Sequence, residues 1–233
     1  MLFCAACQSK SCAARMDQTQ IFPKGCPGQG EKMDAWLQEY DEPLDRLMAQ
    51  KSALCSPDHS ECRLAKTMRF AKECGFHELG LAFCDTLDEQ GRQIDAILRR
   101  NGFQVESVRC KVGHIDRCTI GVPSAQKAMC NPIAQAELLN EAGTELNIIV
   151  GLCVGHDALF IRHSKAPVTV LAAKDHVYDN APLECLKDMQ PCLPGFLTLT
   201  ELKSHRRGFP LRCDCVMMVR PENPARPLLP ARW

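Results

Sequence analysis

The sequence lacks three features that would assign it to common functional classes. Lys and Arg together number 28, as do Asp and Glu, so no excess of one sign of charge exists to attract nucleic acid or anionic lipid. No run of about 18 apolar residues is present to form a membrane-spanning helix. The first residues lack the charged segment and apolar stretch of a secretory signal. We therefore expect a cytoplasmic protein that binds neither nucleic acid nor a membrane.

Cysteine, in contrast, is abundant, at 16 of 233 residues. In a reducing compartment, so many thiols favour metal or thiol chemistry over a disulfide framework. Four of them open the chain in the spacing C-x2-C-x4-C-x13-C-P, namely Cys4, Cys7, Cys12 and Cys26. Few apolar residues surround them, and both zinc and iron–sulfur clusters need about four converging sulfurs. We interpret residues 1–30 as a loop around a metal centre.

The spacing of these four cysteines leaves the identity of the metal open. A single C-x2-C pair is present, and such pairs are typical of zinc sites. The Cys26-Pro27 ending and the dense first three cysteines are instead closer to iron–sulfur motifs. The expected cofactor is therefore either Zn²⁺ or an iron–sulfur cluster.

Composition divides the chain into three parts. Residues 1–55 form the cysteine-rich module and a linking helical segment, in which Pro43 predicts a break or kink. Residues 56–182 alternate between helical and strand-like patterns. Residues 183–233 are rich in Pro and Arg, show little periodicity and suggest at most a strand at 209–219. No role can be assigned to this last part.

The middle part has the pattern of an α/β domain. Helices are predicted over residues 61–74, 86–100 and 131–142 and from about residue 156, and strands over 79–84, 104–111, 146–153 and 168–172. Gly75 is suited to end the first helix, and Asn131-Pro132 is suited to begin the third. Strands separated by helices pair in parallel. We predict an open, mostly parallel, Rossmann-like sheet with helices on both faces.

Cysteines stand where the predicted strands end. Cys84, Cys110 and Cys153 lie at or near the ends of three strands, and Cys130 directly precedes the N-cap of a helix. One cysteine in a buried strand is usually a small apolar residue and no more. The carboxyl ends of parallel strands, however, share one edge, which is where such folds bind ligands. The set of four therefore predicts a second thiol site that holds a metal.

Other polar residues are expected near this edge. Cys62 would reach it if its helix begins there, and Lys111 and Asp157 would orient a small polar ligand. His156 is the best placed histidine for a ligand or acid–base role, because it follows the strongest strand. Each of these side chains could equally be a solvated end of a helix or strand.

An alternative assigns Cys153 as a nucleophile. Residues 151–155 have the form G-x-C-x-G between a strand and a helix, as in a nucleophile elbow. The triad acid and base should then follow in that order. Asp175 and His176 are adjacent, and Asp179 with His205 would reach into the irregular last part. The glycines could instead serve only a tight turn beside a metal or anion.

Several strings in the chain resemble a known family. They are AFC at 82–84, SVRCKVG at 107–113, CNPIAQAELLN at 130–140, LNIIVGLCVGHDALF at 146–160 and KAPVT at 165–169. With the opening cysteines and Cys62-Arg63, they resemble domain of unknown function 1847, an uncharacterised bacterial and archaeal family of presumed metal-binding proteins, over about residues 1–180. The chain departs from that family after Asp175, where the family tends towards D-R-V-x-x-H-N-P.

The resemblance bears on the ligands and brings no known reaction. It implies that five cysteines belong to the family's characteristic set, namely Cys62, Cys84, Cys110, Cys130 and Cys153. Cys55, Cys74 and Cys118 do not belong to it. The leading hypothesis is a metal-binding protein with two cysteine sites and a redox or sulfur-handling role. The alternatives are a structural or regulatory zinc module without catalysis, and a hydrolase that uses Cys153.

Overall fold

The computed structural model describes residues 4–55, 60–124 and 127–187. By its internal contacts the chain divides into a unit from Met1 to Pro182 and a unit from Leu183 to Trp233. Within the second unit the structure describes residues 183–187, of which the first four end the short 3-10 helix η6 (Pro182–Leu186). The strand suggested at 209–219, and the cysteines Cys192, Cys213 and Cys215, lie outside the described residues.

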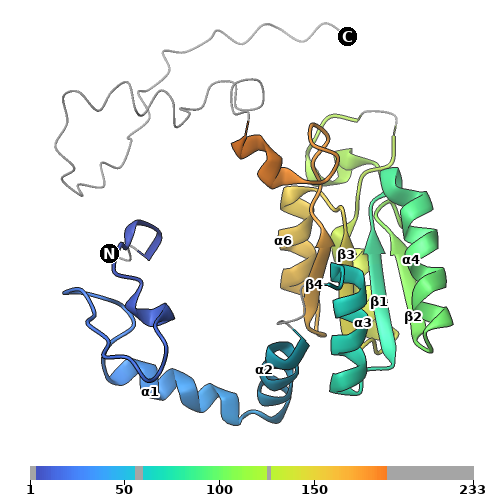
Figure 1. Cartoon of the computed structure of the whole chain (residues 1–233). Helices are drawn as coiled ribbons and strands as arrows, with labels where there is room; N and C mark the ends of the chain where they lie inside the picture. Colours follow the sequence, from blue (N-terminus) through green and yellow to red (C-terminus); the bar gives the residue numbers. More distant parts are fainter. Residues whose placement is uncertain (1–3, 56–59, 125–126, 188–233) are drawn as a thin grey trace, which may run out of the picture. The chain divides into compact units, whose positions relative to one another are not determined.

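The core of the first unit is a four-stranded parallel sheet (Figure 1). Its strands are β1 (Glu78–Phe83), β2 (Gln104–Arg109), β3 (Leu146–Val150) and β4 (Val168–Ala172), in the spatial order β2-β1-β3-β4. All three neighbouring pairs are parallel. The structure thus confirms the predicted α/β class, and the sheet is parallel throughout its described strands.

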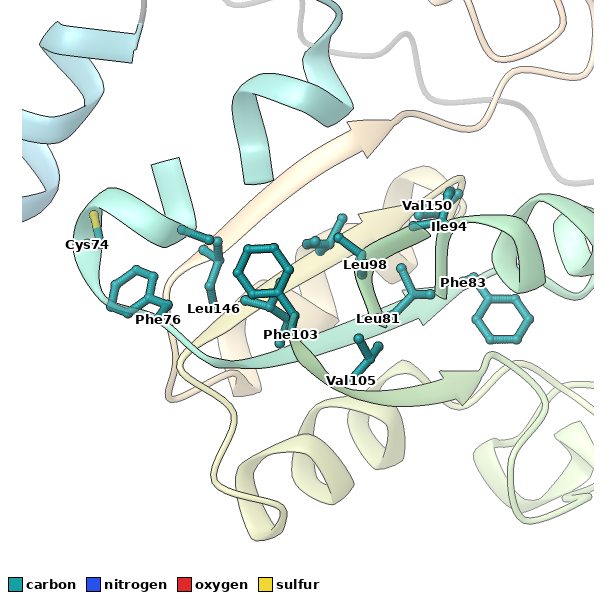
Figure 2. Close-up of a cluster of buried hydrophobic side chains, with 13 residues drawn as sticks. Cys74, Phe76, Leu81, Phe83, Ile94, Leu98, Phe103, Val105, Leu146 and Val150 are labelled. Atoms are coloured by element: carbon teal, nitrogen blue, oxygen red, sulfur yellow. The ribbon is translucent and has the colours of Figure 1, made fainter. Parts of the chain in front are cut away.

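Helices cover both faces of this sheet. The covering helices are α3 (Arg63–Cys74), which precedes the first strand, and α4 (Asp88–Arg100), α5 (Pro132–Glu141) and α6 (Val154–His163), which connect the strands. Side chains of α3 and α4 share one buried cluster with alternate residues of β1 and β3, including Leu81 and Ile148 (Figure 2). Side chains of α5 and α6 share the other with the intervening residues, including Ala82 and Ile149. Burial on both faces explains why these strands are nearly continuous apolar runs.

Local signals in the sequence account for the helix ends. The Asn131 side chain accepts a hydrogen bond from the backbone N–H of Ala134 and so caps α5, with Pro132 at its first position. Gly75 ends α3 at φ 75°, in the left-handed region that glycine adopts without strain. As predicted, Pro43 breaks the helical pattern, because α1 (Glu31–Gln38) has ended before it and a new helix begins there. It is the first residue of α2 (Pro43–Cys55), where its missing N–H has no helical partner to lose.

The strands end earlier than the sequence pattern predicts. β1, β2 and β3 end at Phe83, Arg109 and Val150, so the cysteines follow the strands and lie in the turns beyond them. After β3, the backbone turns at Gly151 with φ 62°, where an added Cβ would stand 2.3 Å from Leu87 Cδ1. The chain must leave the sheet there to begin the next helix.

The segment before the sheet is built from short elements. It contains η1 (Cys4–Ala6), η2 (Ser11–Ala13), α1 (Glu31–Gln38), η3 (Glu39–Asp41) and α2, and η4 (Asp85–Leu87) and η5 (Arg117–Ile120) occur later in the chain. Leu47 and Met48 of α2 pack against the sheet cluster on the side of α3. None of the helices in the described ranges combines the length and apolar character needed to cross a bilayer.

Candidate thiol site at the carboxyl edge of the sheet

The four cysteines expected at the sheet edge lie where the parallel strands end. Cys84 directly follows β1 and Cys110 directly follows β2. Cys153 is the N-cap of α6, after the turn that ends β3, and Cys130 precedes the N-cap of α5. The order in which strands are added reverses between β1 and β3, and ligands of open parallel sheets bind outside the carboxyl ends at such a reversal.

Cys110 and Cys130 form the closest thiol contact of this set that the structure describes. Their sulfurs are 3.6 Å apart, and both are free thiols. The backbone N–H of Asn131 donates to the carbonyl of Cys110 at 2.6 Å, which ties the two chain segments together. The N–H of Asp85 also donates to Cys110 Sγ, at 3.2 Å. Cys110 is almost completely buried. The hydrogen bonds from the backbone of Asn131 and Asp85 hold this residue in place beside Cys130.

Cys84 sits at the end of a short hydrogen-bonded chain. Its sulfur is 3.3 Å from Thr86 Oγ1, and Lys174 Nζ donates to the same hydroxyl at 2.5 Å. Burial acts to raise the pKa of Cys84, but the hydrogen bonds from Thr86 and the nearby charge of Lys174 outweigh it and lower that pKa below its ordinary value. The surroundings of Cys84 therefore favour its thiolate.

The pKa values of Cys110 and Cys153 are shifted in the opposite direction. Burial, with a smaller contribution from the neighbouring Cys130, raises the pKa of Cys110 to about 12. Burial first, and then the proximity of Cys84 and Cys130, raises the pKa of Cys153. A cysteine nucleophile needs a lowered pKa. Cys153 also has extended backbone, at φ −71° and ψ 155°, instead of the strained conformation of a nucleophile elbow.

Three further polar residues named from the sequence lie close to this edge. Lys111 follows Cys110, and its ammonium is 3.0 Å from a carboxylate oxygen of Asp85. His156 and Asp157 lie in the first turn of α6, and burial lowers the pKa of His156. One carboxylate oxygen of Asp157 is buried without a hydrogen-bond partner in the described structure, and burial raises the pKa of Asp157 to about 6.

The Asp157 carboxyl should leave a pH signature in the stability of the metal-free protein. Between about pH 4 and about pH 6 the folded chain holds a proton that the unfolded chain has released, so the free energy of unfolding falls as the pH rises. We expect Asp157→Asn to abolish this fall and to stabilise the protein at neutral pH, because it removes a charge that burial disfavours. The gain should be only about 1 kcal/mol, since water screens the exposed part of the side chain.

Urea unfolding of chelator-treated protein at about pH 4.5 and about pH 7 measures this effect. Asp34→Asn, which changes an exposed aspartate of α1, is the matched control and should leave the pH dependence unchanged. An Asp157→Asn protein with the same slope as the unmodified chain would contradict the prediction.

The remaining sequence-predicted ligands are not joined to this set. Cys62 is the exposed N-cap of α3, beside Arg63, whose guanidinium donates to the carbonyl of Val170 within β4. Cys4, Cys7, Cys12 and Cys26 are exposed or half-exposed. Within the described ranges, no group of three or more His, Cys, Asp and Glu side chains is gathered so that it could hold a metal ion. The N-terminal metal centre and the metal site at the sheet edge therefore both stay predictions.

A cavity of about 560 Å³ lies away from the thiols. Its wall includes Leu146 and Val168, which begin β3 and β4, so it lies towards the amino ends of these strands. α2 and α3 complete the wall, through residues such as Met48 and Phe70. The small polar ligand expected at the thiol edge thus remains a prediction.

Sequence reasoning missed three residues around the thiols. Lys174 and Thr86 form the hydrogen-bonded chain to Cys84, and Gln135 of α5 donates to the carbonyl of Val108 at 2.7 Å. Lys174 follows the last predicted strand by two residues, so its position after a strand end was a usable signal. Gln135 is fully buried, but nothing local in the sequence distinguishes it from a solvated helical glutamine.

Comparisons with known proteins match a stretch of the chain that includes the sheet. The family described as "Protein of unknown function (DUF1847)" matches residues 26–171. An uncharacterised protein of Methanocaldococcus jannaschii, MJ0455, is 42% identical over 147 residues, which cover 60% of this chain and 76% of the relative. No solved structure matches the chain. The matched family region includes all four edge thiols but neither the first three cysteines nor Lys174.

Proposed function

Since the chain belongs to the DUF1847 family, whose description names no reaction, we propose a function from the geometry of its thiols. The protein binds a thiophilic metal, either zinc or an iron–sulfur cluster, at the carboxyl edge of its sheet. The ligands are Cys84, Cys110, Cys130 and Cys153. A second site at Cys4, Cys7, Cys12 and Cys26, and a redox or sulfur-handling role, belong to the same proposal.

The observation that carries this proposal is the distance between Cys110 Sγ and Cys130 Sγ, which is 3.6 Å. Two sulfur ligands of a tetrahedral zinc ion with bonds of about 2.3 Å lie about 3.8 Å apart. The pair therefore already has the spacing of two metal ligands. Cys84 and Cys153 lie close enough to perturb each other electrostatically, and metal binding requires their side chains to turn towards the pair.

The electrostatics of the thiols would make metal binding at this edge depend on pH. Burial raises the pKa of Cys110 and Cys153 because an isolated thiolate is costly where water is excluded. A bound divalent ion reverses this effect, since coordination deprotonates a thiol outright. Binding must then release protons, and metal affinity should rise with pH.

The metal would supply chemistry that the side chains lack: an iron–sulfur cluster transfers an electron, and zinc acts as a Lewis acid or a structural crosslink. The chain's own residues would position the sulfurs and exclude water. The raised pKa of Cys153 and its extended backbone disfavour the alternative in which this cysteine acts as a metal-free nucleophile.

Elemental analysis with an absorption spectrum, on protein purified without oxygen, tests the proposal. Brown protein with iron and acid-labile sulfide supports a cluster and a redox role. Colourless protein with about one or two zinc ions per chain supports the structural zinc alternative. Folded protein that carries no metal and takes up neither Zn²⁺ nor iron and sulfide would overturn it.

A further inference from the structure

β1, β2 and β3 are each followed by a cysteine at the carboxyl edge of the sheet, whereas β4 is followed by Lys174. It follows β4 by two residues, so it lies at the same edge of the sheet as the thiols that follow β1, β2 and β3. Its ammonium donates to Thr86 Oγ1 at 2.5 Å, and that hydroxyl is 3.3 Å from Cys84 Sγ. Two residues from distant parts of the chain therefore converge on one sulfur.

The direction of this chain of hydrogen bonds follows from the groups involved. An ammonium group can only donate, so Thr86 Oγ1 is the acceptor from Lys174. The hydroxyl keeps its own hydrogen, which it donates to Cys84 Sγ when that sulfur is a thiolate, because a thiolate can only accept. A sulfur that accepts this hydrogen bond is stabilised as the thiolate, the form in which cysteine ligates a metal.

We propose that Lys174, acting through Thr86, is a positioning residue of the thiol site that holds Cys84 as an acceptor and offsets the negative charge of a metal–thiolate centre. This inference rests on the proposed function. Four thiolates and one divalent ion carry a net charge of about −2, which is costly at a buried edge. Lys111 is already paired with Asp85 at 3.0 Å, so Lys174 is the better placed of the two lysines to balance that charge.

The test measures the affinity of the edge site for Co²⁺, added alone to the full-length chain under reducing conditions. Cys4 and Cys12 are replaced by serine, so that cobalt–thiolate absorption reports on the edge site. We expect Lys174→Met to weaken Co²⁺ binding about 10-fold to 100-fold, as the loss of other residues behind metal ligands does. Lys174→Arg, which keeps a cationic donor, should largely restore binding.

Thr86 provides an independent arm of the same experiment. Thr86→Val should weaken Co²⁺ binding by a similar factor, and adding Lys174→Met should then change it little, because the lysine acts through the hydroxyl. Lys165→Met is the matched control, since Lys165 precedes β4 at the opposite edge of the sheet. Melting of the metal-free proteins separates these effects from a general loss of structure, and we expect Lys174→Met to leave it unchanged.

The outcomes separate the inference from the proposed function. If Co²⁺ binds through Cys110 but Lys174→Met resembles Lys165→Met, the role of Lys174 is wrong and metal binding stands. A Lys174→Met protein that melts well below the unmodified chain and is not rescued by arginine would also overturn the inference. If the chain that carries only the two serine replacements gives no cobalt–thiolate absorption, both the inference and the sheet-edge metal site are wrong.

Discussion

Replacing Cys110 with alanine should remove the metal from the sheet edge while leaving the fold intact. Cys110 Sγ is 3.6 Å from Cys130 Sγ and 1% of the residue is exposed, so no water can replace the lost ligand easily. Losing a residue that only hydrogen-bonds to a metal ligand lowers metal affinity roughly 10-fold to 100-fold. Because Cys110 would be a ligand itself, its loss should lower Zn²⁺ affinity by more than that. Metal content per chain after dialysis, together with a chelator competition titration, measures the effect.

Cys74→Ala is the matched control for this experiment. Cys74 is also a buried thiol, 9% exposed, and burial raises its pKa, but it packs in the cluster between the sheet and α3. Both variants remove a single buried sulfur, and both should lower the free energy of unfolding of the metal-free protein by about 1 kcal/mol. Equal metal content in the two variants would contradict the assignment of Cys110 as a ligand.

A methyl group added at Gly80 should strongly destabilise the sheet. Gly80 is the partner of Asn147 in the β1–β3 pairing, and a Cβ there would stand 1.8 Å from Asn147 Oδ1. Asn147 is fully buried and cannot move cheaply, because Thr144 donates to its carbonyl oxygen and its amide donates to Ser164, each at 2.8 Å. Gly80→Ala must therefore overpack the core or break these hydrogen bonds.

We expect Gly80→Ala to lower the free energy of unfolding by about 3 kcal/mol, and the melting temperature by about 10 °C. Gly155→Ala is the control, since Gly155 lies in the first turn of α6 with nothing within 4 Å of an added Cβ. It should be neutral or stabilising by about 0.5 kcal/mol. Thermal and urea unfolding of both variants decide the matter, and a Gly80→Ala protein as stable as Gly155→Ala would refute the packing argument.

Much of the fold could be predicted because its signals are local. Val168–Ala172 is a strand in both the prediction and the structure, and the cap at Asn131-Pro132 begins α5 where expected. The errors lie at the ends of elements: β1 ends one residue before Cys84, and β3 ends three residues before Cys153. Such ends depend on how each turn meets its neighbours, as Gly151 meets Leu87, and periodicity does not record that contact.

The candidate site was predictable only to the level of the sheet edge. Parallel strands end on one side, so Cys84, Cys110 and Cys153 had to lie along the same edge once the strands were assigned. The contact between Cys110 and Cys130 could not be predicted from the strand assignment. It depends on the path of the loop between β2 and α5 and on the hydrogen bond from Asn131 to Cys110. The involvement of Lys174 likewise depends on which side chains meet at the strand ends.

The amino-acid sequence by itself determined that this protein is an α/β domain with thiols gathered along one edge, because hydrophobic periodicity, helix caps and parallel pairing are encoded in short stretches of chain. Only the tertiary structure decided which thiols touch, which are destabilised as thiolates, and which lysine stands behind Cys84. Those properties arise from strand order, burial and side-chain direction, which join residues as far apart as Thr86 and Lys174.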